Sequence, residues 1–516
     1  MNDNKTSKNS IVAKFAVPIS FLILFFLAAN FTDCDLVTFW KRRNHLTDLV
    51  VDMIPPDFSY IQKILLPLFY TIQMSVTGTV LGIFFALVLS PFGAANLGFP
   101  AVIRRILRIV IQILRSFPAL ILALTATFLF GLGTFAGTFA ITLYTFAIMT
   151  KLTYEDASAA DVKAYQALRA MGVSKYVAYI HGILPEIIPG FLTNALYLLE
   201  TNVRHSSILG YVGAGGIGLL LNEKISWLEY DKVGTILLML FLTVCVIEYF
   251  SRYLAALIRK ERTIKKEQAR LLLLFLAALF LICTFTLSLP DFSRTSPQTL
   301  RNMFAGFLQP DWSFFFSAEK DGLGYLLLET VCIAFIGTVI GAIVSAPLAF
   351  LNTKRFVPAP VSFLFNLVIM VIRSVPFLVY GLIFIRVSGP GAFTGVLTLA
   401  VCSIGLLTKR FTEALDALDP RPYHALLAMG VRPLPAICHS VLPQLKPVFT
   451  SIILYRFDVN IREASVLGLV GAGGIGAPLI FSMNQYAWEK AGAIMLGLIL
   501  FVWFIDMVSE KIGAGN

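Results

Sequence analysis

Long apolar stretches follow one another along the chain, separated by shorter segments in which the polar residues gather. About 20 apolar residues are needed for a helix to cross a bilayer, so each stretch predicts one membrane-spanning helix. The pattern predicts about six spans in each half of the chain. They lie near 15–31, 64–90, 106–130, 134–150, 190–221 and 234–257, and then near 271–289, 323–351, 361–386, 391–408, 446–481 and 491–508.

Composition agrees with a lipid environment. The 516 residues are 57% hydrophobic and 14% charged, whereas a soluble chain carries about 25% charged residues. The net charge of +11 indicates cytoplasmic loops rather than nucleic-acid binding, because membrane proteins concentrate Lys and Arg on the cytoplasmic side. The basic run at 259–270 directly follows a span and is typical of such a loop. One dissenting cluster, Lys41, Arg42 and Arg43, falls on the opposite side, but the balance favours this orientation. We therefore expect both termini in the cytoplasm.

The second half of the chain repeats the first. Arg115–Pro118 (RSFP) returns as Arg373–Pro376 (RSVP), and Val212–Gly218 (VGAGGIG) returns unchanged as Val470–Gly476, each 258 positions later. Aligned at this offset without a gap, residues 115–218 and 373–476 share roughly 40 identities. Shared hydrophobicity alone does not align Pro, Gly and Arg in register, so the repeat indicates duplication and fusion.

The repeat sets the expected domain organisation. We predict a first unit at 1–258, a basic cytoplasmic linker at 259–270 and a second unit at 271–516. An even number of spans in each half gives both halves the same orientation, so they are parallel rather than inverted repeats.

Each half contains one long polar insert, at 151–189 and at 409–447. The two inserts share a short motif in which a polar residue, Ala and Leu precede a Gly and, about ten residues later, Leu-Pro. This motif resembles the EAA loop of the permeases of binding-protein-dependent ABC importers. The resemblance implies a coupling helix that fits a cleft of a cytoplasmic ATPase, although Gln166 and His424 replace the usual Glu. The motif residues are Gln166, Ala167, Gly172, Leu184, Pro185, His424, Ala425, Gly430, Leu442 and Pro443.

A second motif lies in the fifth predicted span of each half. An acidic residue, Asn and Arg alternate there with apolar residues and precede the glycine-rich segment. The block resembles the phosphonate/phosphite branch of the permease family, which implies a type I importer fold similar to that of methionine importers. The block residues are Glu200, Asn202 and Arg204, repeated as Asp458, Asn460 and Arg462.

These charged residues have two interpretations. Ionisable groups in a span are costly and indicate function by default, so the arginines could line a substrate path. Acid and Arg stand four residues apart on one helix face, so they could instead form a local ion pair. Arg115, Ser116, Arg373 and Ser374 precede a Pro in the third spans and are further path candidates. The alternative for these arginines is an extended side chain that reaches the headgroup level.

The glycine-rich segments formally match a dinucleotide fingerprint, but no strand precedes them. We expect them to serve as a gate or in close helix packing. These glycines are Gly213, Gly215, Gly216, Gly218, Gly471, Gly473, Gly474 and Gly476. The six cysteines lack metal-ligand spacing, so we expect no metal site.

Together the motifs imply a permease in a bacterial inner membrane that carries phosphonate, phosphite or a related oxyanion. The chain has no Walker A pattern, so we expect no enzymatic activity and no cofactor here. ATP and magnesium would bind a partner ATPase, which is expected to be a homodimer. An extracytoplasmic phosphonate-binding protein would deliver the substrate.

Two alternatives remain open at this point. The cargo of the permease could be methionine or a quaternary amine, because importers of those compounds have similar glycine-rich segments. Less favoured is a secondary transporter with twelve spans, which would need acidic residues in mid-span for ion coupling. Glu200, Asp458, Glu248 and Glu329 are the candidates for that role.

Overall fold

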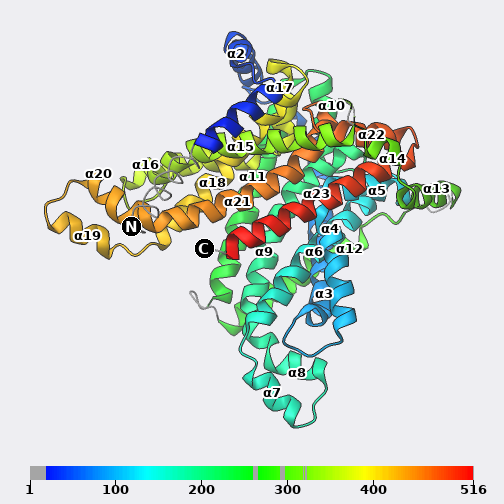
Figure 1. Ribbon diagram of the computed structural model, residues 1–516, viewed down its shortest axis with the longest axis vertical. Coiled ribbons are helices and arrows are strands. Elements are labelled where there is room, and N and C mark those ends of the chain that lie inside the picture. Colours follow the sequence, from blue (N-terminus) through cyan, green and yellow to red (C-terminus); the bar gives the residue numbers. More distant parts are fainter. Residues whose placement is uncertain (1–18, 260–264, 291–296, 318, 320–321, 515–516) are drawn as a thin grey trace, which may run out of the picture. The chain divides into compact units, whose positions relative to one another are not determined.

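The computed structural model describes residues 19–259, 265–290, 297–317, 319 and 322–514. Helices dominate these ranges (Figure 1). Eight are long and apolar enough to cross a membrane, and up to eleven spans result if three bent helix pairs are each counted as one. A shorter apolar helix covers Ile19–Phe31. The prediction of an all-α integral membrane protein is therefore confirmed.

The same order of elements recurs in both halves. The first half contains α2 (Leu36–Asp52), α3 (Ile61–Gly93), α4 (Ala101–Ser116), α5 (Ala119–Phe130), α6 (Thr134–Ala159), α7 (Lys163–Ala170), α8 (Lys175–Gly182), α9 (Leu184–Leu209), α10 (Ile217–Ser226) and α11 (Tyr230–Ile258). The second contains α12 (Lys266–Phe285), α13 (Pro297–Leu308), α14 (Trp312–Phe315), α15 (Leu323–Asn352), α16 (Ala359–Ser374), α17 (Phe377–Ser388), α18 (Ala392–Ala417), α19 (Arg421–Ala428), α20 (Pro433–Ala436), α21 (Leu442–Leu467), α22 (Gly476–Asn484) and α23 (Trp488–Ala514).

The chain forms two compact units that exchange their first spans. Unit 1 contains Met1–Asp48, Gly306–Arg373 and Phe377–Asn516, and unit 2 contains Leu49–Ala305 and Ser374–Pro376. The units therefore divide the chain differently from the sequence repeat. The boundaries at 258 and 271 stay a prediction about that repeat, and residues 260–264 of the predicted linker lie outside the described residues.

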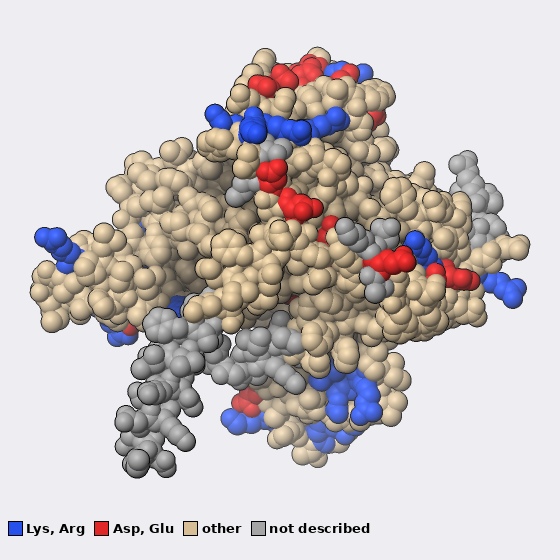
Figure 2. All heavy atoms as spheres, turned by 45° about the horizontal axis from the view of Figure 1, so that its top comes forward, with Lys and Arg blue, Asp and Glu red and all other residues tan. Residues whose placement is uncertain are grey.

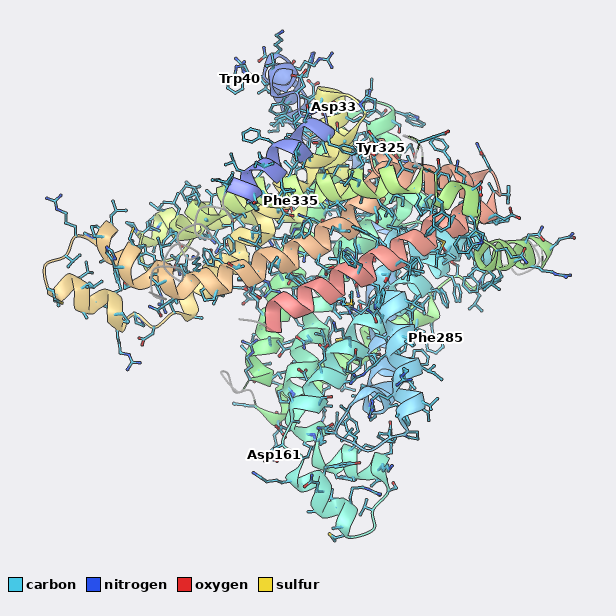
Figure 3. All side chains as sticks on the ribbon, in the orientation of Figure 1. Asp33, Trp40, Asp161, Phe285, Tyr325 and Phe335 are labelled. Carbon is cyan, nitrogen blue, oxygen red and sulfur yellow. The ribbon has the colours of Figure 1, made fainter. Side chains whose placement is uncertain are left out.

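Side-chain contacts inside each unit explain the exchange. In unit 1, Phe21 and Phe31 of the Ile19–Phe31 helix contact Phe335 and Tyr325 of α15, with ring centroids 5.5 and 4.9 Å apart (Figure 3). In unit 2, Nε2 of Gln73 on α3 donates hydrogen bonds to α12, at the carbonyl oxygen of Cys283 (3.0 Å) and at Oγ1 of Thr286 (2.8 Å). Each first span thus packs on the second span of the other half.

Glycines bring the second and fourth spans of each half close together. A Cβ atom on Gly82 of α3 would lie 2.7 Å from Cβ of Thr145 on α6, and Gly78, one turn earlier, is equally close to Ile141. In the second half, a Cβ atom on Gly341 of α15 would lie 2.4 Å from Cβ of Ser403 on α18. Small residues one turn apart allow two membrane helices to approach closely, and dispersion contacts then hold them together.

Two details of the sequence prediction need correction. The fifth spans end at Leu209 and Leu467, before the glycine-rich segments, instead of running on to 221 and 481. Positive backbone φ angles, which glycine alone adopts without strain, end the helices there. The fourth spans continue to Ala159 and Ala417, so one end of each polar insert is helical.

The glycine contact between α3 and α6 generates a test. We expect Gly82→Ala to lower the free energy of unfolding by about 1–3 kcal/mol, the usual cost of overpacking, because the new methyl group would overlap Thr145. Gly190→Ala on α9 is the matched control, since a Cβ atom there meets nothing within 4 Å. Denaturation of the purified protein in mixed micelles measures both. Equal stability of the two variants would contradict the packing described.

Candidate functional site

The acidic and basic residues of the fifth helices form ion pairs. On α9, Nη1 of Arg204 lies 3.0 Å from Oε1 of Glu200, and the two side chains are 13% and 7% exposed. On α21, Nη2 of Arg462 bonds Oδ2 of Asp458 in the same way, at 17% and 13% exposure. The local ion pairs that the sequence left as one of two interpretations are therefore present in both halves, and a role of these residues in a substrate path stays a prediction. Each neutralises an Arg whose unpaired charge would cost several kcal/mol in lipid.

The Asn of each block ties three helices together. Nδ2 of Asn202 on α9 donates to Oγ1 of Thr79 on α3 and to Oγ1 of Thr145 on α6, both at 2.8 Å. Nδ2 of Asn460 on α21 repeats this toward α15 and α18, at Thr338 (2.7 Å) and Ser403 (2.9 Å). Both Asn side chains are fully buried. Hydrogen bonding therefore fixes the register of the fifth helix against the second and fourth.

A further ion pair occurs in the second half only. Nη2 of Arg456 lies 2.8 Å from Oε2 of Glu463, and Nε of Arg456 donates to Oγ of Ser403 (3.2 Å). The Arg456 side chain is 5% exposed and that of Glu463 18%. The equivalent positions in the first half, 258 residues earlier, hold Leu198 and His205. Sequence reasoning missed this pair because it sought motifs present in both halves; the seven-residue spacing, two turns of one helix face, was the available signal.

The third span of each half is broken at the Arg-Ser-x-Pro motif. α4 and α5 meet at an angle of 95°, and α16 and α17 at 87°. Pro376 has no N–H for the carbonyl oxygen of Ile372, four residues earlier. The hydroxyl of Tyr380 donates to that oxygen instead, at 2.9 Å. The bend at the proline thus costs one helical hydrogen bond, and the Tyr380 hydroxyl replaces it.

The break in the second half lies beside the middle of a spanning helix. A Cβ atom on Gly405 would be 2.9 Å from Cγ of Arg373, and Gly405 stands near the midpoint of α18. The stem of Arg373 therefore packs against α18 close to residue 408, where the fourth span is predicted to end. Ser374 is buried at the same break. In the first half, buried Ser116 donates to the carbonyl oxygen of Gln112 (2.9 Å), and Arg115 is partly buried.

The glycine-rich segments form tight turns between the fifth helix and a short returning helix. Gly213 and Gly471 end the 3₁₀ turns that follow α9 and α21, with left-handed φ angles of 84° and 78°. Their carbonyl oxygens accept hydrogen bonds from the N–H groups of Gly133 (3.0 Å) and Gly391 (2.9 Å), which precede the fourth spans. The glycines thus join two loops in each half, a packing role. A gating role stays a prediction.

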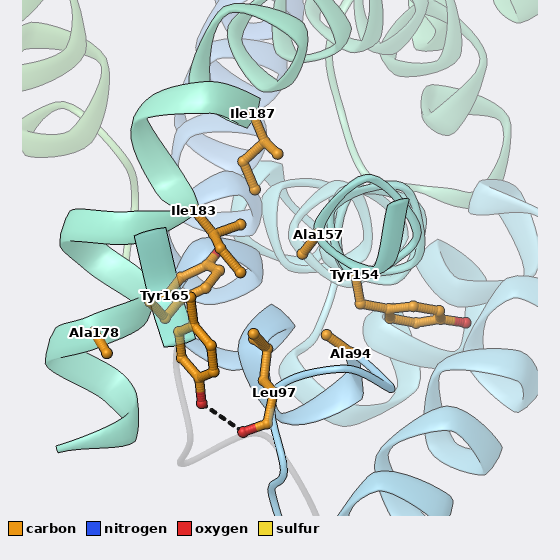
Figure 4. Close-up of a cluster of buried hydrophobic side chains, with 9 residues drawn as sticks. Ala94, Leu97, Tyr154, Ala157, Tyr165, Ala178, Ile183 and Ile187 are labelled. Carbon is orange, nitrogen blue, oxygen red and sulfur yellow. Dashed lines mark hydrogen bonds between the residues drawn. The ribbon is translucent and has the colours of Figure 1, made fainter. Parts of the chain in front are cut away.

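The first polar insert folds into a small helical module. Tyr165 of α7 is buried and donates from its hydroxyl to the carbonyl oxygen of Leu97, 2.6 Å away (Figure 4). Tyr179 and Ile183 complete a closed apolar core beneath α7. Asp161 caps α7 by accepting from the backbone N–H of Lys163 (3.0 Å), and this bond holds the pKa of Asp161 below its usual value.

The outer surface of this module is free. Gln166, Ala167 and Gly172 are exposed, and Met171 between them is 78% exposed. In the second half, His424, Ala425 and Gly430 are exposed in the same way, and Met429 is again 78% exposed. In both halves, the end of this short helix is therefore exposed. Leu184 with Pro185, and Leu442 with Pro443, begin α9 and α21 directly after the inserts.

The second insert packs less completely than the first. A cavity of about 330 Å³ lies under α19, lined by Phe356, Tyr423 and His424 among others. Tyr179, which fills the core in the first half, is replaced by Ile437. Asp419 caps α19 and binds Arg421 (2.8 Å), whose hydrogen bonds lower the pKa of Asp419. Among the described residues no group of three or more His, Cys, Asp or Glu could hold a metal ion.

Comparison with known proteins agrees with the duplicated arrangement. Residues 78–263 and 337–512 each match the family described as the binding-protein-dependent transport system inner membrane component. The phosphate-import permease protein PhnE of Mycolicibacterium smegmatis is 27% identical over 474 residues, covering 90% of the chain and 88% of PhnE. The phosphite transport system permease protein PtxC of Stutzerimonas stutzeri is 36% identical over 184 residues, covering 36% of the chain and 67% of PtxC.

A solved structure of the MetNI methionine ABC transporter in inward-facing conformations also resembles part of the chain. The two chains are 22% identical, and the match covers 39% of this chain and 99% of the transporter chain with a TM-score of 0.36.

The Asn bridge generates a prediction. Asn202→Leu removes two hydrogen bonds between helices and is expected to lower the free energy of unfolding by about 1–3 kcal/mol, since such bonds in membranes contribute about 0.6–1.7 kcal/mol each. Thr201→Val is the matched control, because the Thr201 hydroxyl donates only to the Tyr197 carbonyl oxygen of its own helix (3.0 Å). Denaturation in mixed micelles compares the two. If Thr201→Val lowered the free energy of unfolding as much as Asn202→Leu, the bridging role of Asn202 would be refuted.

Proposed function

Because this chain belongs to the family of binding-protein-dependent transport system inner membrane components, with one match in each half, we propose that it forms the complete membrane path of an ABC importer for a phosphorus oxyanion. The cargo would be phosphonate, phosphite or phosphate. The observation that carries this proposal is the match to the phosphate-import permease PhnE, which extends over 90% of the chain and both halves. The shorter relative PtxC is named for phosphite.

The chemistry of the spans supports an anionic cargo. Arg presents a planar fork of N–H donors that matches phosphoryl oxygens, and each half places Arg in its third and fifth spans. Arg373 precedes the break of its third span and packs against α18, and we assign the broken third spans to the path. The path residues of this proposal are Arg115, Ser116, Arg373, Ser374, Glu200, Asn202, Arg204, Asp458, Asn460 and Arg462.

The proposal includes two partners. A cytoplasmic ATPase, proposed to be a homodimer carrying ATP and magnesium, would dock on the exposed surfaces of α7 and α19. Lys and Arg gather on the end of unit 2 that carries α7 and α8 (Figure 2), as expected of a cytoplasmic surface in a bacterial inner membrane. Both termini are proposed to lie on this side. A phosphonate-binding protein would dock on the opposite, extracytoplasmic face.

Reconstitution tests the cargo. The chain is assembled in proteoliposomes with its partner ATPase and binding protein, and uptake of labelled phosphate, phosphite and methylphosphonate is measured with and without ATP. We expect ATP-dependent uptake of at least one of these anions, unaffected by excess methionine or glycine betaine. Uptake of methionine or of a quaternary amine in place of all three anions would contradict the proposal. Uptake driven by an ion gradient without ATP would identify a secondary transporter.

The docking surface generates a separate prediction. Met171→Asp with Met429→Asp places a charge at two positions that are 78% exposed. We expect loss of most ATPase binding while the free permease remains as stable as before, because neither side chain is buried in the unit. Pull-down of the ATPase measures binding, and Met171→Leu with Met429→Leu is the control. Normal ATPase binding by the Asp variant would exclude these surfaces as the docking sites.

A further inference from the structure

The Arg456–Glu463 pair distinguishes the two fifth helices chemically. Arg456, Asn460 and Glu463 lie on one face of α21, and both Arg456 and Asn460 bond Ser403 on α18. On α9 the same face carries Leu198, Asn202 and His205. The Asn bridge to the second and fourth spans is equally well formed in the two halves, with all four bonds between 2.7 and 2.9 Å.

The fold therefore does not require the additional pair. The first half builds the same three-helix junction with Leu198 and His205. Replacement of a buried ion pair by apolar residues of similar size is often neutral or stabilising, whereas removal of one partner alone is costly. An ionisable pair kept inside a membrane span without an architectural need indicates a function.

The geometry suits an exchange of partners. The guanidinium of Arg456 uses Nε for Ser403 and both Nη atoms for Glu463, at 2.8 and 3.4 Å. Arg has five N–H donors, so these bonds occupy three of them. The longer Nη1 contact is at the limit of a hydrogen bond. Glu463 is the more exposed partner, at 18% against 5% for Arg456.

We propose that Arg456 binds the phosphorus oxyanion during translocation and that Glu463 competes with the anion for it. Between substrates Glu463 neutralises Arg456. When the anion arrives, its oxygens replace the carboxylate on the guanidinium, and Glu463 later reclaims Arg456 and thereby releases the anion. Cargo selection then resides mainly in the second half. This inference rests on the proposed function and adds the residues that set affinity and release.

Two substitutions are expected to act in opposite directions. Arg456→Leu with Glu463→His installs the residues of the first half. We expect the KM for anion uptake to rise about tenfold or more, because the anion loses one charge-assisted hydrogen bond. Glu463→Gln keeps a hydrogen-bond acceptor but removes the competing charge. We expect its KM to fall about tenfold and its kcat to fall as well, because release slows.

The experiment uses the full complex in proteoliposomes, with phosphate, phosphite and methylphosphonate as probes. Initial uptake rates give KM and kcat, and basal ATPase activity reports assembly. Thr450→Val is the control, because its hydroxyl donates only to the Lys446 carbonyl oxygen of its own helix (2.8 Å). Basal ATPase activity of the Thr450→Val control is expected to match that of the wild type.

The outcomes separate this inference from the proposed function. Opposite shifts of KM support the competition between Glu463 and anion. Shifts in the same direction, or none, refute it while wild-type anion uptake leaves the proposed function standing. Failure of the Arg456→Leu, Glu463→His variant to assemble would also refute it, since the pair would then be architectural. Absence of anion uptake by the wild-type complex would remove the proposed function itself.

Discussion

Charge neutralisation inside the membrane is the constraint on which this structure depends. An unpaired ionised group in a span costs several kcal/mol, yet an anion path needs positive charge. The fifth helices pair Arg204 with Glu200, Arg462 with Asp458 and Arg456 with Glu463, and in the proposed path this pairing would meet both demands. The arginines are present but their charge is offset, which keeps them stable in the fold. Because the arginines are paired, a path of this kind does not hold an anion tightly.

Duplication preserved the scaffold and allowed the chemistry to diverge. The Asn bridges, the glycine contacts and the bends of the third spans are present in both halves. The differences lie on surfaces and in polar clusters: Arg456 and Glu463 occur in one half only, and the module under α19 contains a cavity where α7 covers a closed core.

The sequence alone predicted the spans and the repeat and offered the i, i+4 ion pairs as one of two interpretations, because hydropathy and helix geometry are local properties. It did not predict that first spans are exchanged, since the contacts of Phe21 with Phe335 and of Gln73 with Cys283 join residues far apart in the chain. It extended the fifth spans past Leu209 because hydropathy cannot detect the left-handed turn at Gly213. The Arg456–Glu463 pair was not predicted, because neither residue belongs to a motif that both halves share. The roles of the path residues stay predictions.

A double-mutant cycle on Glu200 and Arg204 tests the central claim most directly. The free energy of unfolding is measured in mixed micelles for Glu200→Gln, Arg204→Met and the two together. If the pair exists to neutralise charge, Arg204→Met alone costs about 3–5 kcal/mol by leaving the carboxylate unpaired, and the double substitution recovers most of that loss. Additive losses in the double variant would contradict the claim, because each residue would then contribute to stability independently of the other.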